Sequence, residues 1–156
     1  MMSPRPVSSA PSRTPSVPNA PPRPVTAAVS GAPTLFIAED DPDVRQMLRQ
    51  LLKGQFNVYE APDGQAALEM LARLAPPDAI VLDVMMPRLD GFAVAARIKA
   101  DPRLKDVPLL FLTACDGFKE TVGGINVGAR HYITKPFLPS DLMGKLKRAT
   151  RHAVAR

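Results

Sequence analysis

Short runs of apolar residues alternate along this chain with segments in which apolar residues recur every three or four positions. Bounded apolar runs are typical of strands buried on both faces, whereas a period of three to four residues is typical of helices with one face toward a core. The pattern predicts strands at residues 34–38, 56–60, 79–82, 107–112 and 128–134.

The periodic segments predict a helix after each strand. These helices cover about residues 42–53, 63–74, 91–99, 118–126 and 138–149. Asp41 is the predicted cap of the first helix and Pro42 its first residue. The predicted inward-facing side chains are those of Val44, Met47, Leu48, Leu51, Leu52, Ala67, Leu68, Leu71, Leu74, Phe92, Ala95, Ala96, Ile98, Leu138, Leu142, Leu146 and Ala149.

The helix at 118–126 differs from the others because it contains Gly123 and Gly124. Each glycine costs a helix about 1 kcal/mol relative to alanine. We therefore expect it to be the least stable helix and the element that responds to a change at the neighbouring strand end.

Five alternations of strand and helix predict an α/β fold with a single five-stranded parallel sheet. Right-handed crossovers place helices on both faces, so that the sheet is doubly wound.

Composition separates the chain into a folded part and a tail. Nine of the 18 prolines and six serines fall in residues 1–33, which have no periodic apolar face. We expect 1–33 to be disordered, 34–150 to form one domain and 151–156 to be a short basic end. No segment has the apolar length of a secretory signal or a membrane span, so we expect a cytoplasmic protein without membrane insertion.

The net charge of +5 has an uneven distribution. Residues 34–144 contain 12 basic and 15 acidic residues, a net of −3, and the excess of positive charge lies in the two ends. Without a recognisable motif or supporting aromatic residues, basic ends do not predict DNA binding. The single cysteine, Cys115, excludes an internal disulfide.

Polar residues follow four of the predicted strands. Glu39 and Asp40 end the first, Asp83 follows the third, Thr113 the fourth and Lys135 the fifth. With strand order 2-1-3-4-5, the first and third strands flank the point where the winding reverses, so their carboxylates face each other. Two unit charges 4 Å apart interact by about 4 kcal/mol at an effective dielectric constant of ~20. Such an all-oxygen cluster would take up a proton or bind a hard cation, for which Mg²⁺ is better suited than zinc or copper.

Asp83 has a distinct place within this cluster. The residues after it include Pro87, and the residue before a proline is driven out of the helical region. We therefore expect the chain to form a loop up to Asp90 and Gly91, with Asp83 displayed on that loop above the strand.

Four segments carry a resemblance to a known family. They are FIAEDDPDVR at 36–45, LDVMMPRLDG at 82–91, LTA at 112–114 and GARHYITKPF at 128–137. In this order they resemble the receiver domain of bacterial two-component response regulators, over about residues 34–150. The resemblance implies a CheY-like, flavodoxin-like fold that acts in phosphorelay signal transduction.

The resemblance also implies roles for the acidic residues. Asp83 would accept a phosphoryl group from a phosphohistidine on a sensor histidine kinase or a phosphotransfer protein. Asp40 and Asp83 would ligate Mg²⁺, with Glu39 acting mainly through water and the backbone carbonyl of Met85 as a further ligand.

Three residues at the other strand ends have implied roles as well. Thr113 and Lys135 would bind the phosphoryl oxygens, and Tyr132 would be an aromatic switch that turns inward when Thr113 moves. The Lys135–Pro136 bond is a candidate cis peptide.

This interpretation predicts a stand-alone regulatory protein, not an enzyme beyond its own phosphotransfer and dephosphorylation. It would act through a downstream protein target, either as a terminal regulator or as a phosphorelay intermediate. It could also form a homodimer.

Three alternative functions remain open from the sequence. They are a flavodoxin-like nucleotide or flavin binder, a haloacid-dehalogenase-like phosphatase with Asp41 as nucleophile, and an interaction module that is not phosphorylated. Glu39, Asp40 and Asp41 would repel the phosphate of the first alternative.

Overall fold

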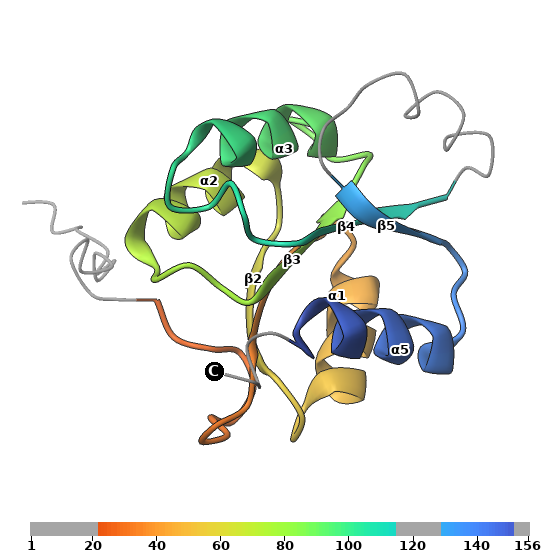
Figure 1. Ribbon diagram of the computed structural model, residues 1–156. Helices are drawn as coiled ribbons and strands as arrows, with labels where there is room; N and C mark the ends of the chain where they lie inside the picture. Colours follow the sequence, from red (N-terminus) through yellow and green to blue (C-terminus); the bar gives the residue numbers. More distant parts are fainter. Residues whose placement is uncertain (1–21, 115–128, 152–156) are drawn as a thin grey trace, which may run out of the picture.

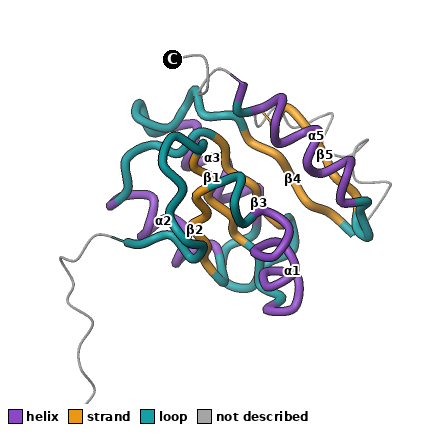
Figure 2. The backbone as a smooth tube through the Cα atoms, turned by 90° about the horizontal axis from the view of Figure 1, so that it is seen from below, coloured by secondary structure: helices purple, strands orange, loops and turns teal. Residues whose placement is uncertain are grey.

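A computed structural model describes residues 22–114 and 129–151 of this chain. Its strands form one parallel sheet in the order β2-β1-β3-β4-β5, as predicted (Figures 1 and 2). The strands are β1 (Thr34–Ala38), β2 (Asn57–Ala61), β3 (Ala79–Asp83), β4 (Leu109–Thr113) and β5 (Ala129–Thr134).

The described part of the chain contains four helices: α1 (Pro42–Leu52), α2 (Gly64–Arg73), α3 (Gly91–Ala100) and α5 (Pro139–Ala149). An aspartate caps each of the first three, and Asp41 caps α1 as predicted, with its carboxylate accepting a hydrogen bond from the Asp43 amide. The predicted helix at 118–126, with Gly123 and Gly124, and Cys115 lie outside the described residues.

Two apolar layers enclose the sheet, one on each face. Side chains of α2 and α3 pack with Phe36 and Phe111 on one face, whereas those of α1 and α5 pack with Leu35 and Leu110 on the other. Figures 1 and 2 show these two helix pairs on opposite sides of the sheet. The helices thus cover both faces, as expected for a doubly wound fold.

Three residues that we predicted to face the core are exposed. Met47 is 47% exposed and Leu138 is 70% exposed, and Ala96 is also at the surface while its neighbour Val94 is buried. Leu138 occupies the position just before α5 and makes no side-chain cap, and Met47 borders a hollow of about 440 Å³ beside Lys135. Apolar spacing marks the core face of a helix, but neighbouring elements decide how much of it is covered.

Residues 25–32 belong to the segment that we assigned to the tail, and they contact the sheet. They lie along β2, where the Val25 amide donates to the Val58 carbonyl over 2.6 Å. The side-chain amide of Asn57 accepts from the Val29 amide at 2.7 Å and donates to the Val29 carbonyl at 2.9 Å and to that of Ala32 at 3.2 Å. β2 is an edge strand, and this segment satisfies backbone groups that would otherwise face solvent.

None of the helices within 22–114 and 129–151 has the length and apolar character needed to cross a bilayer.

Candidate functional site

Three carboxylates converge at the carboxyl edge of the sheet. Glu39 and Asp40 directly follow β1, and Asp83 ends the adjacent β3, whose Leu82 is the register partner of Ala38. One oxygen from each carboxylate lies within 4.8 Å of the others. The structure therefore brings together the acidic residues that the sequence placed at these strand ends.

Asp83 is less accessible than we predicted. It is the last residue of β3 rather than part of a loop, and only 4% of its surface is exposed. The chain returns against it at Gly91, where a Cβ atom would lie 2.5 Å from the Asp83 carbonyl oxygen. The Met85 amide donates to Asp83 Oδ1 over 3.1 Å, and this bond fixes the carboxylate within the cluster. The expectation of a displayed side chain was wrong because the loop folds back over the strand end.

Burial has a large effect on the protonation of Asp83. Removal from water, followed by hydrogen bonding with Glu39 and Asp40, raises the pKa of Asp83 to about 8, although Lys135 acts in the opposite direction. A carboxyl group with this pKa keeps its proton near neutral pH unless a cation enters the cluster.

Glu39 is fully buried and has two defined partners. Its Oε1 accepts a hydrogen bond from Lys135 Nζ at 2.6 Å, and its Oε2 accepts one from the Asp41 amide at 3.1 Å. Lys135 Nζ also lies 3.4 Å from Asp83 Oδ2. Burial alone would lower the pKa of Lys135, but the hydrogen bond with Glu39 and the nearby carboxylates raise it, so the ammonium stays charged.

Thr113 and Tyr132 lie on the two strands beyond β3. Thr113 is the buried last residue of β4, and its carbonyl accepts a hydrogen bond from the Lys135 amide at 2.7 Å. Tyr132 is half-buried and stacks on Phe111 with ring centroids 5.7 Å apart, and burial raises its pKa. The Lys135–Pro136 bond is cis, as predicted. Lys135 and Thr113 are thus joined through the backbone beside the acidic cluster.

The roles that we predicted for Met85 and Tyr132 stay predictions, as do those of the other site residues. The side chain of Met85 is 70% exposed, and the expected role of its carbonyl as a ligand stays a prediction. The inward turn of Tyr132 also stays a prediction.

The side chain of Asp41 faces the start of α1. Its Oδ1 accepts from the Asp43 amide at 2.9 Å, and the residue is exposed. A carboxylate in this cap position has the local role that helix starts favour. This geometry argues against Asp41 as the nucleophile of a phosphatase.

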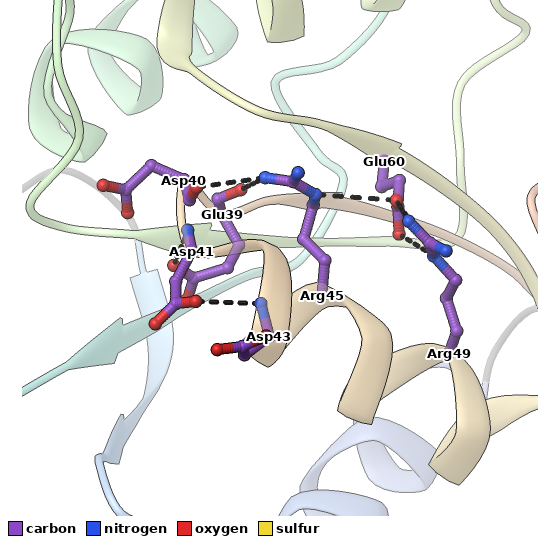
Figure 3. A network of polar contacts seen from close by, with 7 residues as sticks. All are labelled: Glu39, Asp40, Asp41, Asp43, Arg45, Arg49 and Glu60. Atoms are coloured by element: carbon purple, nitrogen blue, oxygen red, sulfur yellow. Dashed lines mark hydrogen bonds and ion pairs between the residues drawn. The ribbon is translucent and has the colours of Figure 1, made fainter.

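Arg45 is a site neighbour that the sequence analysis missed. Its Nη1 donates to the backbone carbonyls of Glu39, at 2.7 Å, and Asp40, at 3.1 Å (Figure 3). The spacing in the sequence could have predicted this contact. Arg45 lies one helical turn after Asp41, and long side chains in a helix point back toward its N-terminus.

The fold and the site define this chain as a doubly wound α/β protein of flavodoxin-like topology with a buried acidic cluster at its strand ends. The chain belongs to the response regulator receiver domain family, whose family model matches residues 35–147. Its resemblance to receivers is therefore confirmed.

Individual relatives agree with this assignment. The chain is 43% identical over 120 residues to Response regulator MprA of Mycobacterium leprae, covering 75% of this chain and 50% of that protein. It is similar to the chemotaxis response regulator CheY4 of Vibrio cholerae, with a TM-score of 0.70 and 29% identity over 76% of this chain and 98% of that one. The receiver domain of sensor histidine kinase PA1611 from Pseudomonas aeruginosa, solved with a magnesium ion coordinated in its active site cleft, gives a TM-score of 0.69 at 26% identity, with the same coverage.

The chain spans about half the length of the curated relatives it matches. What these comparisons establish is a receiver domain of the kind found in two-component signalling.

Proposed function

We propose that this receiver domain takes a phosphoryl group on Asp83 from a phosphohistidine of a sensor kinase or a phosphotransfer protein. An oxygen of Asp83 would form a bond to phosphorus as the bond between phosphorus and the imidazole nitrogen breaks. The observation that carries the proposal is the position of Asp83, within 4.8 Å of oxygens of Glu39 and Asp40 and 3.4 Å from the ammonium of Lys135.

The donor set fits Mg²⁺. It consists of carboxylate oxygens only, which hard divalent cations prefer, and Asp40 at its exposed side leaves room for water ligands. In our proposal Asp40 and Asp83 hold the ion, Glu39 contributes through water and the Met85 carbonyl is a further ligand. Bound Mg²⁺ would screen the charge between the Asp83 carboxylate and the incoming phosphoryl oxygens.

Lys135 and Thr113 would receive the phosphoryl oxygens. The ammonium of Lys135 already lies beside Asp83, and a new group of about −1.5 to −2 charge would compete with Glu39 for it. The Lys135 amide is bonded to the Thr113 carbonyl, so a shift of one residue reaches the other. Tyr132, on the neighbouring strand, would respond to the movement of Thr113 as a switch.

We further propose that the protein is regulatory, catalyses only its own phosphotransfer and dephosphorylation, and signals in the cytoplasm through altered binding to another protein. The family assignment supports this proposal.

The test is incubation of the protein with Mg²⁺ and acetyl phosphate, followed by measurement of the intact mass. We expect wild type to gain one acid-labile phosphoryl group, Asp83→Asn to gain none, and Asp41→Asn to gain one as wild type does. Labelling of Asp83→Asn, or loss of labelling in Asp41→Asn with a folded protein, would refute the assignment of Asp83. Labelling that is unchanged in EDTA would refute the magnesium requirement.

A further inference from the structure

The turn between β1 and α1 carries two of the three clustered carboxylates on consecutive residues. An oxygen of each lies within 4.8 Å of an oxygen of Asp83, although like charges this close repel one another. The backbone carbonyls of the same two residues, Glu39 and Asp40, accept hydrogen bonds from a single nitrogen, Nη1 of Arg45. The orientation of both peptide planes is therefore tied to one side chain.

Arg45 is itself held from its other side. Its Nε lies 3.6 Å from Oε1 of Glu60, whose side chain is only 9% exposed on β2. Glu60 is fixed by Arg49, whose Nε lies 3.0 Å from both carboxylate oxygens and whose Nη2 donates to Oε1. Figure 3 shows the chain of contacts from the acidic turn through Arg45 to Glu60 and Arg49.

The planar guanidinium can make these contacts together because its nitrogens point in fixed directions. The side chain of Arg45 is only 17% exposed, so the network is partly shielded from water. Glu60 is the register partner of Ile37 in the sheet, so the network ties the turn to a rigid strand.

We infer that Arg45 is a positioning residue, which holds the Glu39–Asp40 turn so that its two carboxylates face Asp83. This inference rests on the proposed function, because it assumes that the acidic cluster binds Mg²⁺. Outer partners that orient metal ligands affect metal affinity by about 10- to 100-fold when they are removed.

The direction in which Mg²⁺ affinity changes on replacement of Arg45 distinguishes a positioning role from a purely electrostatic one. Removal of a nearby positive charge should strengthen the binding of a divalent cation if charge alone matters. Loss of a positioning contact should weaken it, because the carboxylates can then turn apart.

The test compares Arg45→Met with Arg49→Met, which makes the same change in net charge and removes a guanidinium from the same Glu60 without touching the two carbonyls. We expect calorimetric titration with Mg²⁺ to give an affinity at least about tenfold weaker for Arg45→Met and within about twofold of wild type for Arg49→Met. Arg45→Lys, which keeps the charge and perturbs folding least, should also weaken binding, because one ammonium cannot bridge both carbonyls and Glu60.

A second readout needs no metal. In EDTA, amide hydrogen exchange at residues 39–43 should be faster in Arg45→Met than in wild type or Arg49→Met. Unchanged or stronger Mg²⁺ binding in Arg45→Met, or equal losses in the two methionine variants, would overturn the inference. If wild type itself bound no Mg²⁺, the proposed function would fail, and the exchange comparison would still decide whether Arg45 holds the turn.

Discussion

The ammonium of Lys135 lies 2.6 Å from Oε1 of Glu39, a carboxylate with no exposed surface. The two residues are 96 positions apart in the sequence. The same ammonium lies 3.4 Å from Asp83, so one lysine compensates two acidic side chains of the cluster. The chain's own residues thus partly neutralise the acidic cluster.

Replacement of Lys135 by methionine should destabilise the protein. It leaves Glu39 buried without its cation, and removal of one partner of a buried pair costs about 3–5 kcal/mol. Because the side chain of Lys135 is 21% exposed, we expect a smaller loss of about 2–3 kcal/mol in the free energy of unfolding. Thermal unfolding with and without Mg²⁺ measures it, and Mg²⁺ should stabilise this variant more than wild type because the ion replaces the missing charge.

Lys145→Met is the matched control. Lys145 pairs with Asp141 at 3.4 Å, but that carboxylate is 48% exposed, so its loss should cost less than about 1 kcal/mol. Equal losses of unfolding free energy in the two variants would show that the Lys135–Glu39 pair stabilises the protein no more than an exposed ion pair does.

The stability of the metal-free protein should depend on the protonation of Asp83. The folded state raises the pKa of this group from 3.8 to about 8, so it holds a proton that the unfolded chain releases. The resulting stabilisation is complete below the unfolded value and is lost as the pH rises through about 8. Urea unfolding in EDTA at a series of pH values in this window should show wild type losing stability relative to Asp83→Asn. Parallel pH profiles for the two proteins would contradict the raised pKa.

Gly64→Ala should disturb the loop that follows Asp83. A Cβ atom at this position, the first residue of α2, would lie 2.2 Å from the Leu89 carbonyl oxygen. We expect a loss of about 1–3 kcal/mol in the free energy of unfolding and slower phosphorylation by acetyl phosphate, since the loop carries Met85. Gly144→Ala in α5 is the control, because a Cβ there meets no atom within 4 Å, and it should stabilise the protein by about 0.5–1 kcal/mol. Stability and labelling unchanged in Gly64→Ala would exclude this close approach.

Asn57→Ala should release residues 25–32 from β2. The change removes three hydrogen bonds to the backbone of Val29 and Ala32, each with a net contribution of about 0.5–1.5 kcal/mol. We expect a stability loss of about 1–3 kcal/mol, together with faster hydrogen exchange in 25–32. Gln55→Ala, at an exposed neighbouring position, should leave that exchange unchanged. The hydroxyl of Thr26 also donates to the Phe56 carbonyl at 3.3 Å. Persisting protection in Asn57→Ala would show that this bond and the Val25 amide suffice to hold the segment.

The sequence alone determined the order and type of the described elements, the cap of the first helix and the strand ends that carry the acidic residues, threonine and lysine. These features follow from local signals. Apolar runs indicate strands, and an apolar period of three to four residues indicates helices. An aspartate just before a helix accepts hydrogen bonds from the unpaired amides of the first helical turn. Because parallel strands share a carboxyl edge, strand-end residues such as Glu39 and Asp83 could be expected to meet.

Only the tertiary structure decided how those residues are surrounded. It buried Asp83 under the returning chain at Gly91, paired Glu39 with Lys135, and bound Arg45 to the carbonyls of the acidic turn. It also left Met47 in solvent. The burial of a side chain and its choice of ion-pair partner depend on residues far apart in the chain. The local sequence pattern therefore does not predict them. The pKa of Asp83 depends on that surrounding, because the same carboxyl group titrates near 4 in water and about 8 in this cluster.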